Sequence, residues 1–247
     1  MKNYYAISDV HGRLDLLEEA IKTVDLSKPE NTLVLVGDYV DRGPNSLGVL
    51  QYIMSLKSNF PKQVITLMGN HDKMFLDFIF EGDTLGLEND WNLNTVKSFL
   101  SEHEYFEDIS YFENNIYLKK DYSVVTNEIR DYIQQRFQSE LAFLQSLDYY
   151  FESSNFIFVH AGVDFDLEDW RESNKFRMIW QRPSFREVNN TGKVLVVGHT
   201  PVSSFTKDKS NDIFEYSVGI GDSIFYIDGG AVLSNQLNVW IGREKEY

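Results

Sequence analysis

The chain has 247 residues, 43% of them hydrophobic and none of them cysteine, and its formal net charge is −15. This composition supplies a sizeable core for one α/β domain or two small ones, and the missing cysteines exclude disulfides, thiol nucleophiles and thiolate metal sites. The negative charge argues against a nucleic-acid partner, and the lack of a long apolar run argues against a signal peptide or a membrane partner, so we expect a cytoplasmic protein.

The first 70 residues alternate between apolar strands and amphipathic helices. The pattern predicts strands over Tyr4–Val10, Thr32–Val36 and Gln63–Met68, and helices over Arg13–Val24 and Pro44–Leu56. Alternation of this kind predicts parallel β-α-β units and therefore an α/β fold. In such units, ligands collect beyond the carboxyl ends of the strands.

The pattern changes between about residues 73 and 151, which are aromatic-rich, acidic and mostly helical in character. The clearest amphipathic stretches are Trp91–Leu100 and Asn127–Leu147. We expect residues 1–247 to form a single domain in which this helical insertion covers one side of the site.

The remaining sequence returns to short strands. Apolar runs predict strands over Asn155–Val159 and Val194–Val197. Three later segments alternate like antiparallel strands, namely Ile213–Val218, Ser223–Ile227 and Gln236–Ile241. A turn is predicted at Gly229-Gly230, between the last two of them.

Four of the five histidines lie in short polar blocks that follow apolar runs. The blocks are Asp9-Val10-His11-Gly12, Gly37-Asp38-Tyr39-Val40-Asp41-Arg42-Gly43, Gly69-Asn70-His71-Asp72, His160-Ala161-Gly162 and Gly198-His199-Thr200-Pro201. The simplest physical reason for this placement is that several strands deliver oxygen and imidazole ligands to one shared site. Asp, Asn and His are the ligands that a pair of divalent metals needs.

The spacing of these residues predicts how two cations would be shared. Asp9 and His11 can hold one cation, and Asp38 can bridge both with a single carboxylate. The second cation would be completed by Asn70, His160 and His199. Two divalent cations about 3.5–4 Å apart can share a hydroxide, align it and stabilise an in-line displacement at phosphorus.

Four further residues are candidates for work on the substrate. His71 can protonate a departing alkoxide, and Asp41 can hold its other ring nitrogen. Arg42 and Arg182 can clamp phosphate oxygens through their planar guanidinium groups. Structural alternatives stay open for each: His71 can hydrogen-bond loop backbone, and the arginines can form salt bridges. The fifth histidine, His103, has no ligand-like neighbours and is expected at the surface.

The five blocks together resemble the calcineurin-like metallophosphoesterases, specifically the phosphoprotein phosphatase branch with its compact bacterial and phage serine/threonine phosphatases. The diadenosine tetraphosphate hydrolases of the same branch are also similar. The resemblance implies a four-layer αββα sandwich of two mixed sheets flanked by helices. It also implies Asp9, His11 and Asp38 on one metal, and Asp38, Asn70, His160 and His199 on the other. His71 with Asp41 would be the proton donor, and Arg42 a phosphate binder.

Two departures from the branch pattern bear on substrate. Asp72 stands where protein phosphatases have Glu, and this Asn-His-Asp form is common in the dinucleotide hydrolases. Trp180-x-Arg182, in contrast, resembles the protein-phosphatase segment that supplies a second phosphate-binding arginine. The replacement of the usual Gly by Ser8 is expected to be minor.

We therefore predict a metal-dependent phosphomonoesterase that acts on phosphoserine or phosphothreonine in proteins, with phosphotyrosine as a further substrate. Small phosphoesters are the alternative substrate class. Two other functions stay open: a symmetrical diadenosine tetraphosphate hydrolase, and a catalytically silent scaffold. The resemblance favours manganese as the metal, with iron, zinc and magnesium as alternatives.

Overall fold

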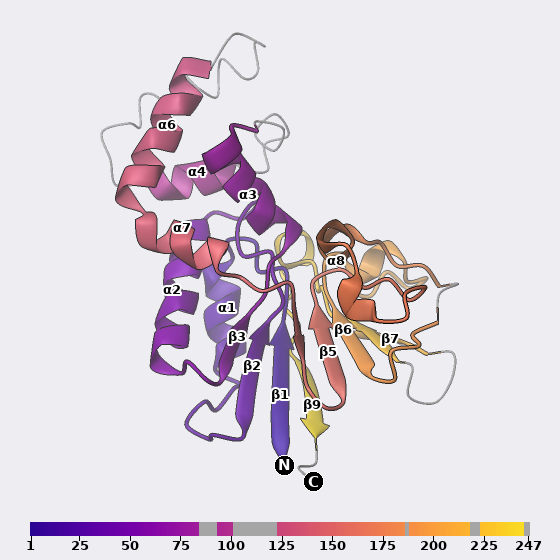
Figure 1. Ribbon diagram of the computed structural model, residues 1–247. Helices are drawn as coiled ribbons and strands as arrows, with labels where there is room; N and C mark the ends of the chain where they lie inside the picture. Colours follow the sequence, from indigo (N-terminus) through magenta and orange to yellow (C-terminus); the bar gives the residue numbers. More distant parts are fainter. Residues whose placement is uncertain (84–92, 101–122, 186–187, 218–222, 245–247) are drawn as a thin grey trace.

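The structure is a computed structural model (Figure 1). It describes residues 1–83, 93–100, 123–185, 188–217 and 223–244. Part of the predicted insertion, the beginning of the stretch predicted from Trp91, and His103 lie outside these residues. No described helix is long and apolar enough to cross a membrane.

The first sheet has the strand order β3-β2-β1-β9. Its strands are β1 (Lys2–Ile7), β2 (Asn31–Leu35), β3 (Val64–Thr66) and β9 (Trp240–Glu244). The first three strands are parallel, as predicted from the β-α-β pattern, and β9 is antiparallel to β1. The connecting helices α1 (Leu14–Ile21) and α2 (Ser46–Asn59) lie on one side of this sheet (Figure 1).

The second sheet has the strand order β4-β5-β6-β8-β7. Its strands are β4 (Tyr150–Glu152), β5 (Phe156–Val159), β6 (Val194–Val197), β7 (Phe214–Tyr216) and β8 (Ile224–Tyr226). The three central strands β5, β6 and β8 are parallel, and the edge strands β4 and β7 are antiparallel to their neighbours. Short helical segments adjoin this sheet: η1 (Trp170–Glu172), α8 (Lys175–Trp180) and η2 (Val202–Ser204).

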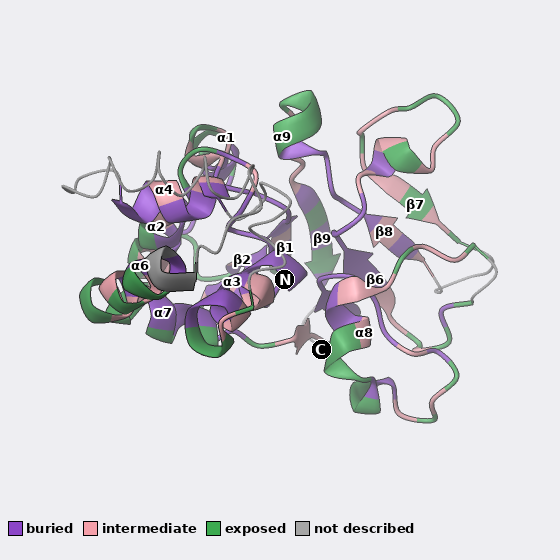
Figure 2. Ribbon diagram, turned by 90° about the horizontal axis from the view of Figure 1, so that it is seen from above, coloured by how far each residue is buried: buried purple, intermediate pink, exposed green. Residues whose placement is uncertain are grey.

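The two sheets pack face to face through alternating strand residues. One buried cluster holds the inward side chains, namely Tyr4, Ala6, Val34, Val36, Phe156, Phe158, Val196 and Trp240. The residues between them, such as Leu33, Leu35 and Ile157, belong to a second buried cluster that includes apolar helix residues. Because successive strand side chains point to opposite faces, each strand serves two layers of core. The predicted sandwich of two mixed sheets with helices outside it is confirmed; seen from above, most exposed residues lie on helices and loops (Figure 2).

The helices after β3 are α3 (Asn70–Glu81), α4 (Leu93–Leu100), α6 (Ser123–Arg136) and α7 (Gln138–Gln145). The amphipathic stretch predicted over Asn127–Leu147 is helical, but it is divided between α6 and α7, because the chain leaves helical geometry at Phe137 (φ −118°, ψ 41°). The ring of Phe137 packs edge-on against Phe99, with the centroids 4.9 Å apart.

The last strand also differs from its prediction over Gln236–Ile241. Strand β9 begins only at Trp240 and pairs with β1 in the first sheet. Gln236 and Asn238 instead direct their side-chain amides to the Asp212 carboxylate and the Asn211 carbonyl. The one-turn helix α9 (Ala231–Ser234) follows directly after the predicted turn at Gly229-Gly230. Gly230 itself is left-handed, at φ 71°.

Candidate metal centre

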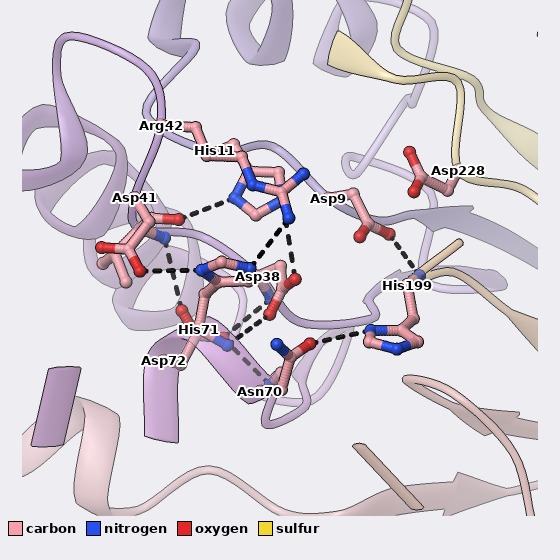
Figure 3. Close-up of polar contacts among 12 residues, drawn as sticks. Asp9, His11, Asp38, Asp41, Arg42, Asn70, His71, Asp72, His199 and Asp228 are labelled. Atoms are coloured by element: carbon pink, nitrogen blue, oxygen red, sulfur yellow. Dashed lines mark hydrogen bonds and ion pairs between the residues drawn. The ribbon is translucent and has the colours of Figure 1, made fainter. Parts of the chain in front are cut away.

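The predicted ligand residues meet where the carboxyl ends of strands from both sheets converge (Figure 3). Asp9 and Asp38 follow β1 and β2, and Asn70 opens helix α3 directly after β3. His160 and His199 follow β5 and β6 of the second sheet. All five side chains are buried. The site therefore depends on the packing of one sheet against the other.

Asp38 occupies the middle of the centre. Its Oδ2 lies 3.6 Å from His11 Nε2 and 3.4 Å from His160 Nε2. Two groups of potential ligand atoms share this residue: His11, Asp38 and His71 form one, and Asp38, His160 and His199 form the other. A carboxylate common to two ligand groups is what a bridging role requires.

Asn70 and Asp9 extend this arrangement. Asn70 Oδ1 lies 3.1 Å from His160 Nε2 and 2.8 Å from His199 Nδ1, so it belongs with the second group. Asp9 Oδ2 accepts a hydrogen bond from the His199 backbone N–H at 2.9 Å. The other Asp9 oxygen, Oδ1, is buried without a hydrogen-bond partner among the described residues. An orphaned buried carboxylate oxygen is costly unless something else binds it, and a cation would do so.

Backbone carbonyl groups orient two of the imidazole rings. His11 Nδ1 lies 2.8 Å from Val40 O, and His160 Nδ1 lies 2.8 Å from Val36 O. With Nδ1 placed to donate to a carbonyl, the Nε2 atom of each ring faces Asp38. Outer hydrogen bonds of this kind are typical of metal-binding histidines. With carboxylate and amide oxygens beside them, the residues present fit two divalent cations.

Burial and neighbouring charge set the protonation of the centre. Burial lowers the pKa of both His11 and His199 to about 3, so their rings are neutral near pH 7. Burial alone would raise the pKa of Asp38, but the charges of His160 and His71 hold it well below its usual value. Burial alone would lower the pKa of His160, but Asp38 raises it to about 10. A divalent cation would take the place of the His160 proton, because metal ligands bind deprotonated.

The backbone is left-handed at most of these positions. Of the eight described non-glycine residues with positive φ, six are predicted site residues: Asp9, His11, Asp38, Asp41, Arg42 and His199. Such conformations cost roughly 1–3 kcal/mol each and cluster at functional sites.

The model of the calcineurin-like phosphoesterase family matches residues 3–221 of the chain. The chain belongs to this family. The predicted family is thereby confirmed, and phosphoesterases of this family use two divalent cations.

Individual relatives of this calcineurin-like phosphoesterase differ in substrate. The symmetrical bis(5′-nucleosyl)-tetraphosphatase of Legionella pneumophila (strain Corby) is 46% identical over 78 residues, which are 32% of this chain and 27% of that protein. The chain thus matches about a quarter of the length of this curated relative.

Two solved structures share the fold. The cold-active protein-tyrosine phosphatase of a psychrophilic Shewanella species has a TM-score of 0.56 at 18% identity, covering 98% of this chain and 75% of that one. A protein serine/threonine phosphatase from Saccharomyces cerevisiae has a TM-score of 0.52 at 13% identity, covering 100% and 81%. Identities this low establish the fold of the phosphoesterase and not its substrate.

Beside the predicted ligands, His71 lies between the acidic side chain of Asp41 and the basic side chain of Arg42. Its Nδ1 is 2.8 Å from Asp41 Oδ2, and its Nε2 is 3.0 Å from Arg42 Nη2. Burial alone would lower the pKa of His71, but the carboxylates of Asp38 and Asp41 raise it above its ordinary value. Thr95 in turn holds the Asp41 carboxylate, because its Oγ1 donates to Asp41 Oδ1 at 2.8 Å. Thr95 was not predicted, because it lies in helix α4, far along the chain from Asp41.

Asp72 is a second residue whose part was not predicted. Its Oδ2 accepts from the backbone N–H groups of Asp38 and Gly69, and its Oδ1 from those of Tyr39 and Val40, at 2.8–3.3 Å. Burial and the charge of Asp38 raise its pKa to about 7. Asp72 therefore fixes the loop that carries the shared carboxylate, although it does not face the centre as a ligand.

Two glycines leave room for the ligands. A Cβ on Gly69 would lie 2.1 Å from Asp38 Oδ1, and a Cβ on Gly198 would lie 2.2 Å from Asp9 Oδ2. Only glycine permits this close approach, which explains its place in both motifs.

Arg182 lies at the edge of the centre on the side of the second sheet. It is exposed, and its Nη1 lies 3.3 Å from Thr200 Oγ1, next to His199. The ring of Trp180 packs edge-on against His199, with the centroids 5.9 Å apart. The predicted Trp180-x-Arg182 segment therefore adjoins the second ligand group.

Asp228 is a buried carboxylate near Asp9 that sequence reasoning did not assign to the site (Figure 3). Its Oδ1 accepts from Gly230 N at 2.8 Å, and burial together with the charge of Asp9 raises its pKa well above the ordinary value. A signal was present, because Asp228 follows an apolar strand as Asp9 and Asp38 do.

Proposed function

We propose that this phosphoesterase is a metal-dependent phosphomonoesterase that acts on phosphoserine and phosphothreonine in proteins. The observation that carries the proposal is the Asp38 carboxylate, which lies within 3.6 Å of a histidine from each of the two ligand groups. Two divalent cations, when bound, supply a nucleophile from water at neutral pH and neutralise charge on the phosphoryl oxygens.

The first task of the protein is to hold these cations. We assign Asp9, His11 and Asp38 to one of them. The second would be held by Asp38, Asn70, His160 and His199. Support comes from the carbonyl-bound rings of His11 and His160 and from the unpartnered Asp9 oxygen. We further propose manganese, for which mixed carboxylate and imidazole ligands are suitable.

The second task is to bind the phosphoryl group and to assist the leaving group. Arg42 and Arg182 lie beside the two ligand groups and would hold the non-bridging oxygens with their guanidinium donors. His71, kept basic by Asp41, would give a proton to the departing serine or threonine oxygen. The closed hydrogen-bond chain from Thr95 through Asp41 to His71 supports this role.

A second candidate function is hydrolysis of a dinucleoside tetraphosphate. It is favoured by the 46% identity to the Legionella pneumophila tetraphosphatase and by the Asn70-His71-Asp72 form of the third motif. The Trp180-x-Arg182 segment beside His199 favours the protein phosphatase instead.

A direct comparison separates the two. The protein would be loaded with manganese and given a phosphoserine peptide or diadenosine tetraphosphate, and phosphate release and ADP formation would be measured. Faster turnover of the peptide supports the first proposal, and faster formation of ADP supports the second. If neither substrate turns over with manganese, magnesium, zinc or iron, both proposals fail. The same panel ranks the metals.

A further inference from the structure

A pocket of about 700 Å³ lies on the second sheet, and no predicted site residue lines it. Its apolar wall comes from the rings of Phe185, Phe205, Phe214 and Tyr216. Its polar rim is the loop over residues 206–212, which leads into β7 (Figure 2). We call this feature the aromatic pocket.

The rings of the aromatic pocket hold one another in place. Phe185 lies 5.4 Å from Phe205 and 5.1 Å from Tyr216, both measured between ring centroids. Phe205 and Phe214 meet edge to face at 5.7 Å. The Tyr216 hydroxyl donates to the Phe185 carbonyl at 2.6 Å, so the chain is fixed at the mouth of the pocket. Phe185 nevertheless stays 40% exposed, so one face of this ring is open to a ligand.

The loop residues that line the pocket include two carboxylates, Asp208 and Asp212, and one ammonium group, Lys207, whereas Lys209 belongs to the same loop but does not line the pocket. Asp208 Oδ1 accepts from Ser210 N, and Asp212 Oδ1 accepts from Gln236 Nε2, each at 3.1 Å. Across the described ranges of the chain, neither Asp208 nor Asp212 forms an ion pair. Acceptors with unused capacity therefore stand beside exposed ring faces.

We propose that the aromatic pocket binds an arginine side chain of a partner protein. A guanidinium group is planar, stacks on aromatic faces and forms paired hydrogen bonds with carboxylates, so it matches both the wall and the rim. A nucleotide fits less well, because its phosphates would face Asp208 and Asp212. A neutral apolar ligand would cover these carboxylates without satisfying them.

The pocket is connected to the metal centre by two short segments. Phe185 is three residues from Arg182, and Val202, which also lines the pocket, is three residues from His199. Three residues span at most about 11 Å. A partner with its phosphorylated residue roughly three to five residues from the docked arginine could therefore reach the centre. This last step rests on the proposed phosphoprotein phosphatase function, whereas the binding of arginine does not.

Calorimetry tests the binding of arginine directly. The intact protein would be titrated with a short unphosphorylated peptide that contains one arginine, and with the same peptide carrying citrulline. We expect the arginine peptide to bind at least tenfold more tightly. Asp208→Asn with Asp212→Asn should remove the preference, and Phe185→Ala should weaken arginine binding. Asp166→Asn changes an exposed carboxylate outside the pocket and should change nothing.

Equal binding of the two peptides would overturn the proposal. So would a preference for adenosine, or a self-association of the protein that Phe185→Ala abolishes, since each would name a different occupant. The charge variants alter exposed residues, and unchanged thermal unfolding would show that their effect is local.

Turnover measurements distinguish the proposed arginine pocket from the proposed phosphatase function. With manganese loaded, a phosphoserine peptide bearing arginine four residues away should show about tenfold higher kcat/KM than its citrulline form. Hydrolysis of p-nitrophenyl phosphate should not change in the pocket variants. If the arginine peptide binds but no phosphopeptide turns over, the phosphatase proposal fails and the pocket stands. If phosphopeptides turn over without regard to arginine, the pocket has no part in substrate choice.

Discussion

Replacing Asp72 with Asn should destabilise the protein severely. The two carboxylate oxygens each accept from two backbone N–H groups, so all four contacts are donors. An amide supplies only one acceptor oxygen, and its NH₂ group would face two of those donors whichever way it turns. A hydrogen bond to a charged group contributes about 1.5–3 kcal/mol. Loss of two such bonds would cost about 3–6 kcal/mol, out of the roughly 5–15 kcal/mol that hold a typical domain, and part of this cost is offset because the neutral amide escapes the burial penalty of the charged carboxylate.

Urea unfolding followed by circular dichroism would measure this loss. A pH of 8 suits the assay, because it lies above the Asp72 pKa of about 7. Asp77→Asn is the matched control, since it makes the same change on the same helix and breaks only the ion pair with Lys73. The control should cost less than about 1 kcal/mol. If the free energies of unfolding of the two variants differ by less than about 1 kcal/mol, the hydrogen bonds to Asp72 are not what holds the Asp38 loop in place.

The remaining predictions concern the centre and one surface cluster. Asp38→Asn should deplete both metal positions in elemental analysis; two fully occupied positions would contradict a bridging carboxylate. His71→Asn should lower kcat about 10²–10⁴-fold at unchanged metal content, and unchanged turnover would remove its acid role. Gly198→Ala places a Cβ 2.2 Å from Asp9 Oδ2, so manganese affinity should fall about 10–100-fold, as seen by titration. Burial alone would raise the pKa of Glu152, but Lys193 and Arg171 hold it below its ordinary 4.5. These ion pairs therefore stabilise the fold above about pH 4.5 and lose that effect as pH falls through the folded-state pKa. Glu152→Gln should thus cost about 1 kcal/mol at pH 7, and this cost should shrink as pH falls through the folded-state pKa of Glu152.

The strands that deliver the ligands could be predicted because their signal is local. Each is a short apolar run followed within two residues by a polar ligand-type residue, as at Val34–Val36 before Asp38 and at Phe156–Val159 before His160. Parallel strands then bring their carboxyl ends to one edge without further information. The meeting of two sheets at this edge came from the resemblance to a family, and not from periodicity.

What could not be predicted depends on contacts between distant segments. A helix pattern continues through Phe137, yet packing against Phe99 ends the helix there. Thr95 and Asp72 serve the site through hydrogen bonds to Asp41 and to the Asp38 loop, and no spacing in the sequence indicates either bond. The aromatic pocket in the same way joins Phe185 to residues of a second segment, 202–216.

The left-handed residues show why the motifs are more than turns. Gly12 and Gly37 occupy left-handed positions beside the centre at φ 64° and 93°, where glycine bears no steric cost. At neighbouring left-handed positions the chain instead carries His11, Arg42 and His199, although positive φ is uncommon for residues other than glycine. Six such residues at roughly 1–3 kcal/mol each approach the net stability of a domain. Glycine at these six positions would relieve that cost, so a chain under selection for stability alone would carry it there. Under the proposed function, the oxygen, imidazole and guanidinium groups of these side chains are what the centre requires, and the fold supplies compensating contacts such as the four bonds to Asp72.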